Sequence, residues 1–111
     1  METKVFISGK ERKLRNNALI PRKYRNTFGR DLIFDMNKLV TSYKENPELA
    51  NTEVLENITF LMLKEAGEDV GETVEEFLAS LENIFDLYNV LDDVVSLWAA
   101  GNKTTATSKK K

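Results

Sequence analysis

The stretch TEVLENITFLMLKEA, residues 52–66, predicts a helix with apolar side chains on more than one side. Apolar residues recur in it at steps of three and four, as in an amphipathic helix: Val54, Leu55, Ile58, Leu61 and Met62. Phe60 and Leu63 widen this stripe, and Gly67 is suited to end the helix. Because so broad an apolar surface has to be covered, we expect other elements to pack against this helix on several sides.

Two helices are predicted before this stretch. Pro21 suits a first helical turn, and Gly29 can end the same helix in the left-handed conformation. The next helix begins after Asp31, whose side chain can cap it, and ends at Asn46-Pro47. Its apolar residues also recur at steps of three and four: Leu32, Ile33, Met36, Leu39, Val40 and Tyr43. Both helices are therefore expected to bury one face.

The region after Gly71 repeats the same helical pattern. A capping box at Thr73-Val-Glu-Glu76 predicts a helix start. Two apolar stripes follow, first Val74, Phe77, Leu78, Leu81, Ile84, Phe85 and Tyr88, and then Leu91, Val94, Val95 and Trp98. Residues 73–100 could form one helix or two. A break at Asp86 or Asn89 would give ordinary helix lengths, so we predict two.

A β-hairpin is predicted at the N-terminus, over about residues 3–16, with its turn at Gly9. A two-stranded hairpin is only marginally stable in water. We therefore expect Val5 or Phe6, together with Leu14, to pack on a helix. The whole pattern predicts a mainly α fold, a small helical domain of about five helices with a short N-terminal β-hairpin over residues 1–101. Residues 102–111 have no large apolar side chain, so a disordered basic tail is expected.

The composition excludes several kinds of functional site. The 111 residues include no cysteine and no histidine, which removes disulfides, thiolate metal sites and histidine-based catalysis. The adjacent carboxylates Glu75/Glu76 and Asp92/Asp93 point in different directions on a helix and cannot share a proton at close range. We expect no enzymatic activity, no cofactor and no metal. A signal sequence and a membrane-spanning apolar run are missing, which predicts a soluble, cytosolic protein without a membrane partner.

Charge is distributed very unevenly along the chain. The formal net charge is +7 over residues 1–44, −13 over residues 45–101 and +4 over residues 102–111, which sums to −2. Such a split indicates electrostatic contact between two surfaces, within one molecule or between copies, at least as readily as an anionic partner. Self-association is therefore one option to test.

Nucleic-acid binding is the competing interpretation of the basic half. Arg22, Lys23 and Arg25 flank Tyr24, and phosphate contacts beside a stacking ring are what such binding needs. Helix geometry argues against it, because Tyr24 lies on the same side as the apolar residues of its helix and is expected in the core. Seven residues remain as candidates for contact with a partner: Arg22, Lys23, Arg25, Arg30, Phe60, Leu63 and Trp98.

One string of residues resembles a known family. The string is Tyr24-Arg-Asn-Thr-Phe28-Gly29-Arg30-Asp31-Leu32. It is followed by a helix of the type Asp35-Met-Asn-Lys-Leu39 and preceded by a hairpin with Gly9-Lys10-Glu11. This arrangement is similar to the tail assembly chaperones of long-tailed bacteriophages, especially those of Gram-positive hosts, over roughly residues 3–100. Arg12 stands where the family often has an aromatic residue.

The resemblance implies a mainly helical protein that is not an enzyme. It implies a chaperone that acts in the host bacterial cytoplasm during viral morphogenesis, coats the aggregation-prone tape measure protein and is absent from the mature virion. It also implies recruitment of tail tube subunits, through a longer product made by a programmed ribosomal frameshift. Lys109-Lys110-Lys111 is compatible with a slippery adenine-rich site. The alternative function is a small nucleic-acid-binding regulator that uses the basic N-terminal half.

Overall fold

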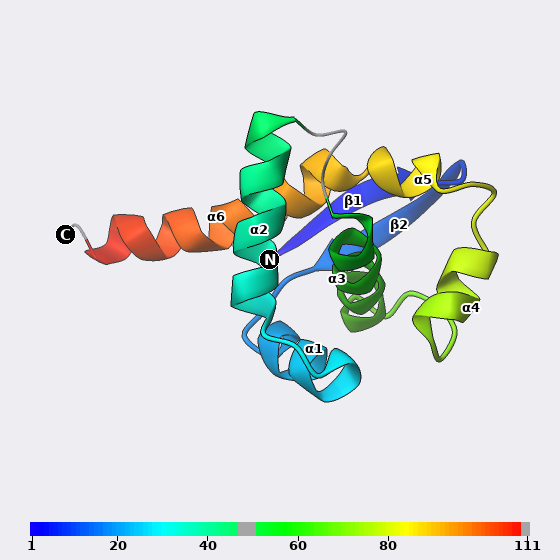
Figure 1. Cartoon of the computed structure of the whole chain (residues 1–111), viewed down its shortest axis with the longest axis horizontal. Helices are drawn as coiled ribbons and strands as arrows, with labels where there is room; N and C mark the ends of the chain where they lie inside the picture. The colour runs from blue at the N-terminus through cyan, green and yellow to red at the C-terminus, as the bar shows by residue number, and fades with distance from the viewer. Residues whose placement is uncertain (47–50, 110–111) are drawn as a thin grey trace.

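The computed structural model describes residues 1–46 and 51–109, and it is mostly helical with one antiparallel hairpin. Figure 1 shows the order of the elements: β1 (Glu2–Ile7), β2 (Lys10–Arg15), α1 (Ile20–Phe28), α2 (Leu32–Glu45), α3 (Thr52–Glu65), α4 (Val74–Ala79), α5 (Phe85–Tyr88) and α6 (Leu91–Lys109). The predicted fold class is confirmed. No helix in the described part of the chain is both long enough and apolar enough to cross a membrane.

Helix α3 occupies the centre of the structure. It contacts β2, α1, α2, α4 and α5, and Figure 1 shows it surrounded by these elements. Its buried residues include Val54, Leu55 and every residue from Asn57 to Leu63. The expectation that this helix is covered on several sides is therefore confirmed.

The hairpin lies over α3 through the inward face of its strands. Val5, Ile7 and Leu14 are buried, whereas Phe6 points outward and is 66% exposed. The turn residues Ser8 and Gly9 have φ of 52° and 76°, the positive values that a tight hairpin turn requires. Of the two alternatives, Val5 is thus the β1 residue that packs inward with Leu14.

The corner between α1 and α2 is formed by the predicted local signals. Pro21 lies in the first turn of α1, and Gly29 ends it at φ 68° with its N–H donating to the Arg25 carbonyl at 2.8 Å. The Asp31 carboxylate then accepts a hydrogen bond from the Phe34 N–H at 3.1 Å and caps α2. This corner directs α2 back across α3.

Residues 73–100 are broken more often than predicted. Three helical segments, α4, α5 and the first part of α6, replace the two that were expected. The extra break has a local cause, because the Asn83 side chain accepts from the Phe85 N–H at 2.9 Å and begins a separate turn. Ile84 and Phe85 consequently leave the apolar face of α4, and both are exposed.

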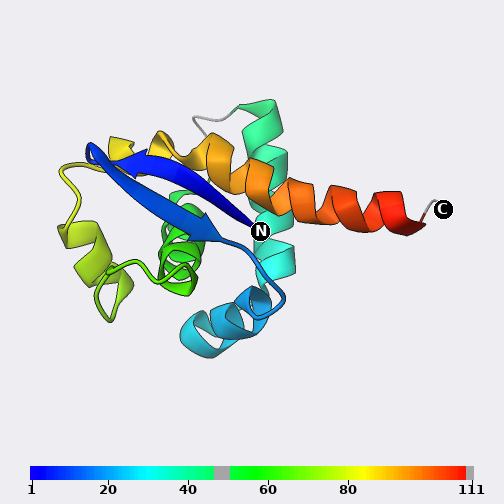
Figure 2. The same cartoon turned by 180° about the vertical axis from the view of Figure 1, so that it is seen from behind.

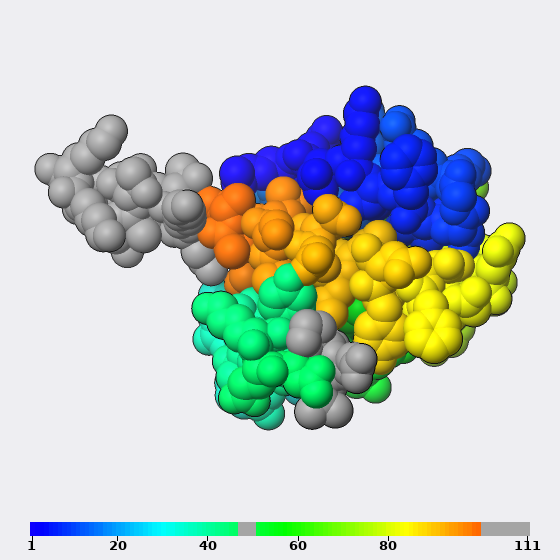
Figure 3. Space-filling model, turned by 90° about the horizontal axis from the view of Figure 1, so that it is seen from above, coloured from blue at the N-terminus to red at the C-terminus, as the bar shows by residue number. Residues whose placement is uncertain are grey.

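Helix α6 lies beside β1 and then extends away from the rest of the structure (Figures 1 and 2). Seen from above, it runs between the hairpin and α2 (Figure 3). The helix continues to Lys109, where the sequence predicts a disordered tail from residue 102. Residues 102–109 contain no proline that would break the helix, but five of the eight are Asn, Thr or Ser, which are weak helix formers. Residues 110–111 lie outside the described residues.

Gly29→Val is expected to lower the free energy of unfolding by about 1–3 kcal/mol, because a β-branched residue is strained at positive φ. No atom lies within 4 Å of the position that a Cβ would take, so the loss comes from the backbone alone. Denaturant unfolding measures it. Gly29→Asn is the matched control and should lose less, since asparagine adopts this conformation more readily. Equal stability of all three proteins would contradict the left-handed corner.

Thr59→Val is expected to stabilise the protein by about 1 kcal/mol. Thr59 on α3 is fully buried, and its Oγ1 has no hydrogen-bond partner among the described residues. An unpaired buried hydroxyl costs roughly 1–3 kcal/mol, and valine replaces it with a methyl group of similar shape. Thermal and denaturant unfolding provide the measurement. A loss of stability would show that the hydroxyl is hydrogen-bonded.

Candidate partner-binding surface

The buried carboxylate of Asp35 binds two residues of the string from Tyr24 to Leu32. Asp35 is only 1% exposed and accepts hydrogen bonds from one residue of α1 and one residue of the corner. The Tyr24 hydroxyl donates to Oδ2 at 2.8 Å. Arg30 donates through Nε to Oδ2 at 2.7 Å and through Nη2 to Oδ1 at 2.8 Å. This two-pronged contact is the strong form of an arginine–carboxylate pair. The Asp35 carboxylate therefore ties Tyr24 of α1 and Arg30 of the corner to α2.

The pKa shifts in this network follow from the same contacts. The Arg30 hydrogen bonds hold the pKa of the Asp35 carboxyl below its ordinary value, although burial acts in the opposite direction. Burial, and then the hydrogen bond to Asp35, raise the pKa of the Tyr24 hydroxyl. At neutral pH Asp35 is ionised and Tyr24 is protonated, which is the pairing that the hydrogen bonds need.

Other basic side chains of the N-terminal half are paired with the acidic half. Arg12 Nε donates to the Glu68 carboxylate at 2.6 Å, and its Nη2 donates to the Asp69 carbonyl at 2.7 Å. Lys23 forms an ion pair with Glu65. Lys23 and then Asn17 lower the pKa of the Glu65 carboxyl through hydrogen bonds. The uneven charge distribution is thus partly neutralised within one molecule.

The four basic partner candidates, the cluster of Arg22, Lys23, Arg25 and Arg30, separate into two groups. Lys23 and Arg30 are held by carboxylates of the same chain. Arg22 and Arg25 are exposed on α1, and the guanidinium group of neither forms a hydrogen bond or ion pair within residues 1–46 and 51–109. Tyr24 is fully buried, which confirms its place in the core. Only two cations of the cluster therefore remain free for an anionic partner.

The three apolar candidates do not form a surface. Phe60 and Leu63 are 2% and 0% exposed, so neither can contact a partner in this conformation. Helix α4 covers Phe60, whose ring centroid lies 6.2 Å from that of Phe77. Trp98 on α6 is half-buried and packs against the core. This position agrees with its place in the last apolar stripe of the sequence.

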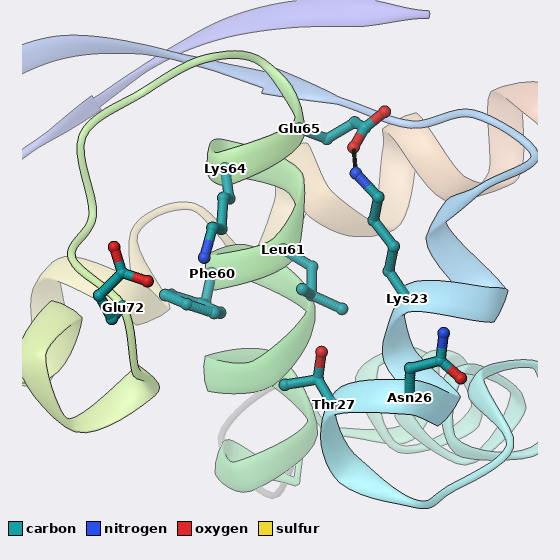
Figure 4. A pocket seen from close by; sticks show the side chains of 8 residues that line it. All are labelled: Lys23, Asn26, Thr27, Phe60, Leu61, Lys64, Glu65 and Glu72. Atoms are coloured by element: carbon teal, nitrogen blue, oxygen red, sulfur yellow. Dashed lines mark hydrogen bonds and ion pairs between the residues drawn. The ribbon is translucent and has the colours of Figure 1, made fainter.

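A small pocket lies between α1 and α3 (Figure 4). Its volume is about 270 Å³, and it is lined by Lys23, Asn26, Thr27, Phe60, Leu61, Lys64, Glu65 and Glu72. The Lys23–Glu65 pair crosses one side of it, and the Lys64 ammonium lies 5.5 Å from the centre of the Phe60 ring. Across the described residues, no group of three or more acidic side chains could hold a metal ion.

Two exposed apolar pairs were missed by the sequence patterns. The α2 patch consists of Ile33 and Phe34, which are 56% and 54% exposed. The α5 patch consists of Ile84 and Phe85, which are 39% and 68% exposed. The helical spacing assigned Ile33, Ile84 and Phe85 to buried stripes. The spacing could have revealed Asp35 instead, because it lies three residues after Leu32 on the buried face of α2.

Comparison with protein families, curated proteins and solved structures finds no match for this chain.

Asp35→Asn is expected to lower stability at neutral pH and to reduce the loss of stability in acid. Because the folded-state pKa of Asp35 is depressed, its contribution is complete above the ordinary pKa of about 4 and is lost as the pH falls through the folded value. The measurement is the free energy of unfolding between pH 2 and pH 7.

Tyr24→Phe is the matched control for this measurement. It removes one neutral donor and keeps the Arg30–Asp35 pair, so it should cost about 0.5–1.5 kcal/mol and retain most of the acid sensitivity. If Asp35→Asn showed the same pH dependence as the unmodified protein, the carboxylate would not be the paired group described above.

Proposed function

We propose that this protein is a tail assembly chaperone of a long-tailed bacteriophage. It binds and solubilises the tape measure protein in the host cytoplasm, and a longer frameshift product helps to recruit tail tube subunits. The observation that carries the proposal is the string from Tyr24 to Leu32, on which the family resemblance rests. Its residues act together, since Tyr24 and Arg30 both bind Asp35 and Gly29 makes the turn between them.

Exposed apolar side chains support a role in binding an apolar client. Ile33, Phe34 and Phe85 are each more than half exposed, and burial of such groups against a client helix is favourable. The acidic C-terminal half supplies charge that keeps a complex with an aggregation-prone protein soluble. A binding protein rather than an enzyme is further supported by a chain without histidine or cysteine.

The alternative function is a nucleic-acid-binding regulator. The observation in its favour is the pair of exposed cations Arg22 and Arg25 on α1, whose guanidinium groups have no partner among the described residues. Against it, Lys23 and Arg30 are already bound to Glu65 and Asp35 of the same chain. Tyr24 is buried and cannot stack on a base. Two phosphate contacts are few for a nucleic-acid interface, which favours the chaperone.

The two functions predict different responses to salt. For a chaperone, we expect fragments of the tape measure protein of the same phage to co-purify with the full chain, and to remain bound between 50 and 200 mM salt. Buried apolar area carries this affinity and is little affected by screening. For a regulator with two phosphate contacts, affinity for DNA or RNA would fall roughly tenfold over the same range.

A variant with both Arg22→Ala and Arg25→Ala is the control. It should bind tape measure fragments as the unmodified protein does, because neither side chain is apolar. A salt-sensitive complex with DNA or RNA that this variant abolishes, without any retention of tape measure fragments, would reject the chaperone and support the regulator.

A further inference from the structure

A groove runs along one face of α3, between α1 and α4. Two hollows make it up, with volumes of about 270 Å³ and 490 Å³, and their linings share Thr27, Phe60 and Glu72. Figure 4 shows Phe60 of α3 between Thr27 of α1 and Glu72, which directly precedes the N-cap residue of α4. We call the two joined hollows the α3 groove.

The charge of the groove changes along α3. Four residues follow one another at steps of three and four and so lie on one face of this helix: Glu53, Glu56, Phe60 and Lys64. The two glutamates line the larger hollow, and Lys64 lines the smaller one. The acidic end of the α3 groove therefore lies toward the start of α3.

Negative charge in the larger hollow is not neutralised by the described part of the chain. Four carboxylates line the hollow: Glu53, Glu56, Glu72 and Glu75. None of them forms an ion pair with a described residue, and the guanidinium of Arg30 in the same lining is already bound to Asp35. Burial, and then the charge of Glu53, raise the pKa of the Glu56 carboxyl. Such a shift is expected for like charges without a cation between them.

Apolar side chains form a wall among these acids. Phe28, Val74 and Leu78 line the larger hollow, and each is half-buried and packed against the core. The ring of Tyr24 supports Phe28, with the two ring centroids 5.0 Å apart. A half-buried apolar centre with a charged border is the usual composition of a protein-binding surface.

An occupant of this groove has to satisfy its own backbone hydrogen bonds. Helices and the turns at their ends line the groove, so an extended peptide finds no strand edge to pair with there. We propose that the α3 groove binds a basic amphipathic helix of a partner protein. The apolar face of that helix lies on Phe28, Val74 and Leu78. Its Lys or Arg side chains pair with carboxylates of the border, among them Glu53 and Glu75.

Charge selects this occupant over others. A basic helix neutralises the four carboxylates, whereas an acidic segment or a nucleic acid would meet like charge. The chemistry of the partner follows from the groove alone. Its identity rests on the proposed function, which supplies an apolar helical client, and the inference then specifies that the bound segment of this client is basic.

Fluorescence anisotropy with synthetic peptides tests this chemistry on the full chain. The lysine probe is a labelled helix of about 18 residues with leucines along one face and lysines on both borders of that face. The glutamate probe carries glutamate in place of every lysine. We expect saturable binding of the lysine probe and at least about tenfold weaker binding of the glutamate probe. Equal binding of both probes, or binding of neither, would overturn the proposal.

Charge reversal locates the binding site. A variant with Glu53→Lys and Glu75→Lys should bind the lysine probe at least about tenfold less tightly and gain affinity for the glutamate probe. The matched control carries Glu11→Lys and Glu82→Lys, which make the same change of net charge at exposed positions outside the groove. It should retain the lysine probe. Circular dichroism confirms the fold of each variant, and an equal loss in both variants would overturn the site.

Leu78→Ala tests the apolar wall, with Leu81→Ala as its matched control. Both leucines are half-buried and packed against the core, but only Leu78 lines the groove. Leu78→Ala should weaken binding of the lysine probe about tenfold, as expected for an apolar anchor. Leu81→Ala should leave the affinity unchanged. Equal affinities of these two variants would contradict the docking of an apolar helix face on this wall.

The same variants separate this inference from the proposed function. Tape measure fragments that still bind the variant with Glu53→Lys and Glu75→Lys would leave the chaperone function in place and overturn the groove as its client site. A chain that binds the lysine probe in the groove but retains no tape measure fragment would overturn the chaperone function and support the groove.

Discussion

The burial of α3 on several sides is the constraint on which the rest of the structure depends. Nine residues of this helix are buried, and β2, α1, α2, α4 and α5 contact it. A helix with so much apolar surface cannot remain at the edge of a domain, because each exposed side chain would lose roughly 1.5–3 kcal/mol of burial free energy. The hairpin, α1, α2 and the short helices are arranged as its cover. Thr59 is buried in this helix although its hydroxyl has no hydrogen-bond partner among the described residues.

The corner between α1 and α2 determines how two of the covering helices meet α3. Gly29 makes the turn, and the Asp35 carboxylate then binds Tyr24 of α1 and Arg30 of the corner. The consequence for function is electrostatic. Arg30 is a candidate for contact with a partner, but it is bound to Asp35 of the same chain. Lys23 is likewise bound to Glu65. The surface that remains for partners is therefore more apolar than the composition of the string indicates.

Turns and helix caps could be predicted from the sequence, whereas the packing of distant elements against one another could not. Gly29 and the Asp31 cap depend on backbone geometry within a few residues, so their positions were predicted correctly. Helical spacing cannot decide which side of a broad stripe meets solvent, and it placed Ile33 in the core. It also missed the break at Asn83, which moved Phe85 to the surface. Phe60 was considered for a partner surface because α4 could not be placed over it from sequence alone.

Native-state hydrogen exchange, followed residue by residue, tests the central role of α3 most directly. If the other elements are arranged around this helix, its amides from Asn57 to Leu63 should exchange only through global unfolding, with the highest protection in the chain. Their exchange free energies should then equal the free energy of unfolding measured with denaturant. Amides of α3 that exchange faster than those of the hairpin or α2 would contradict this account.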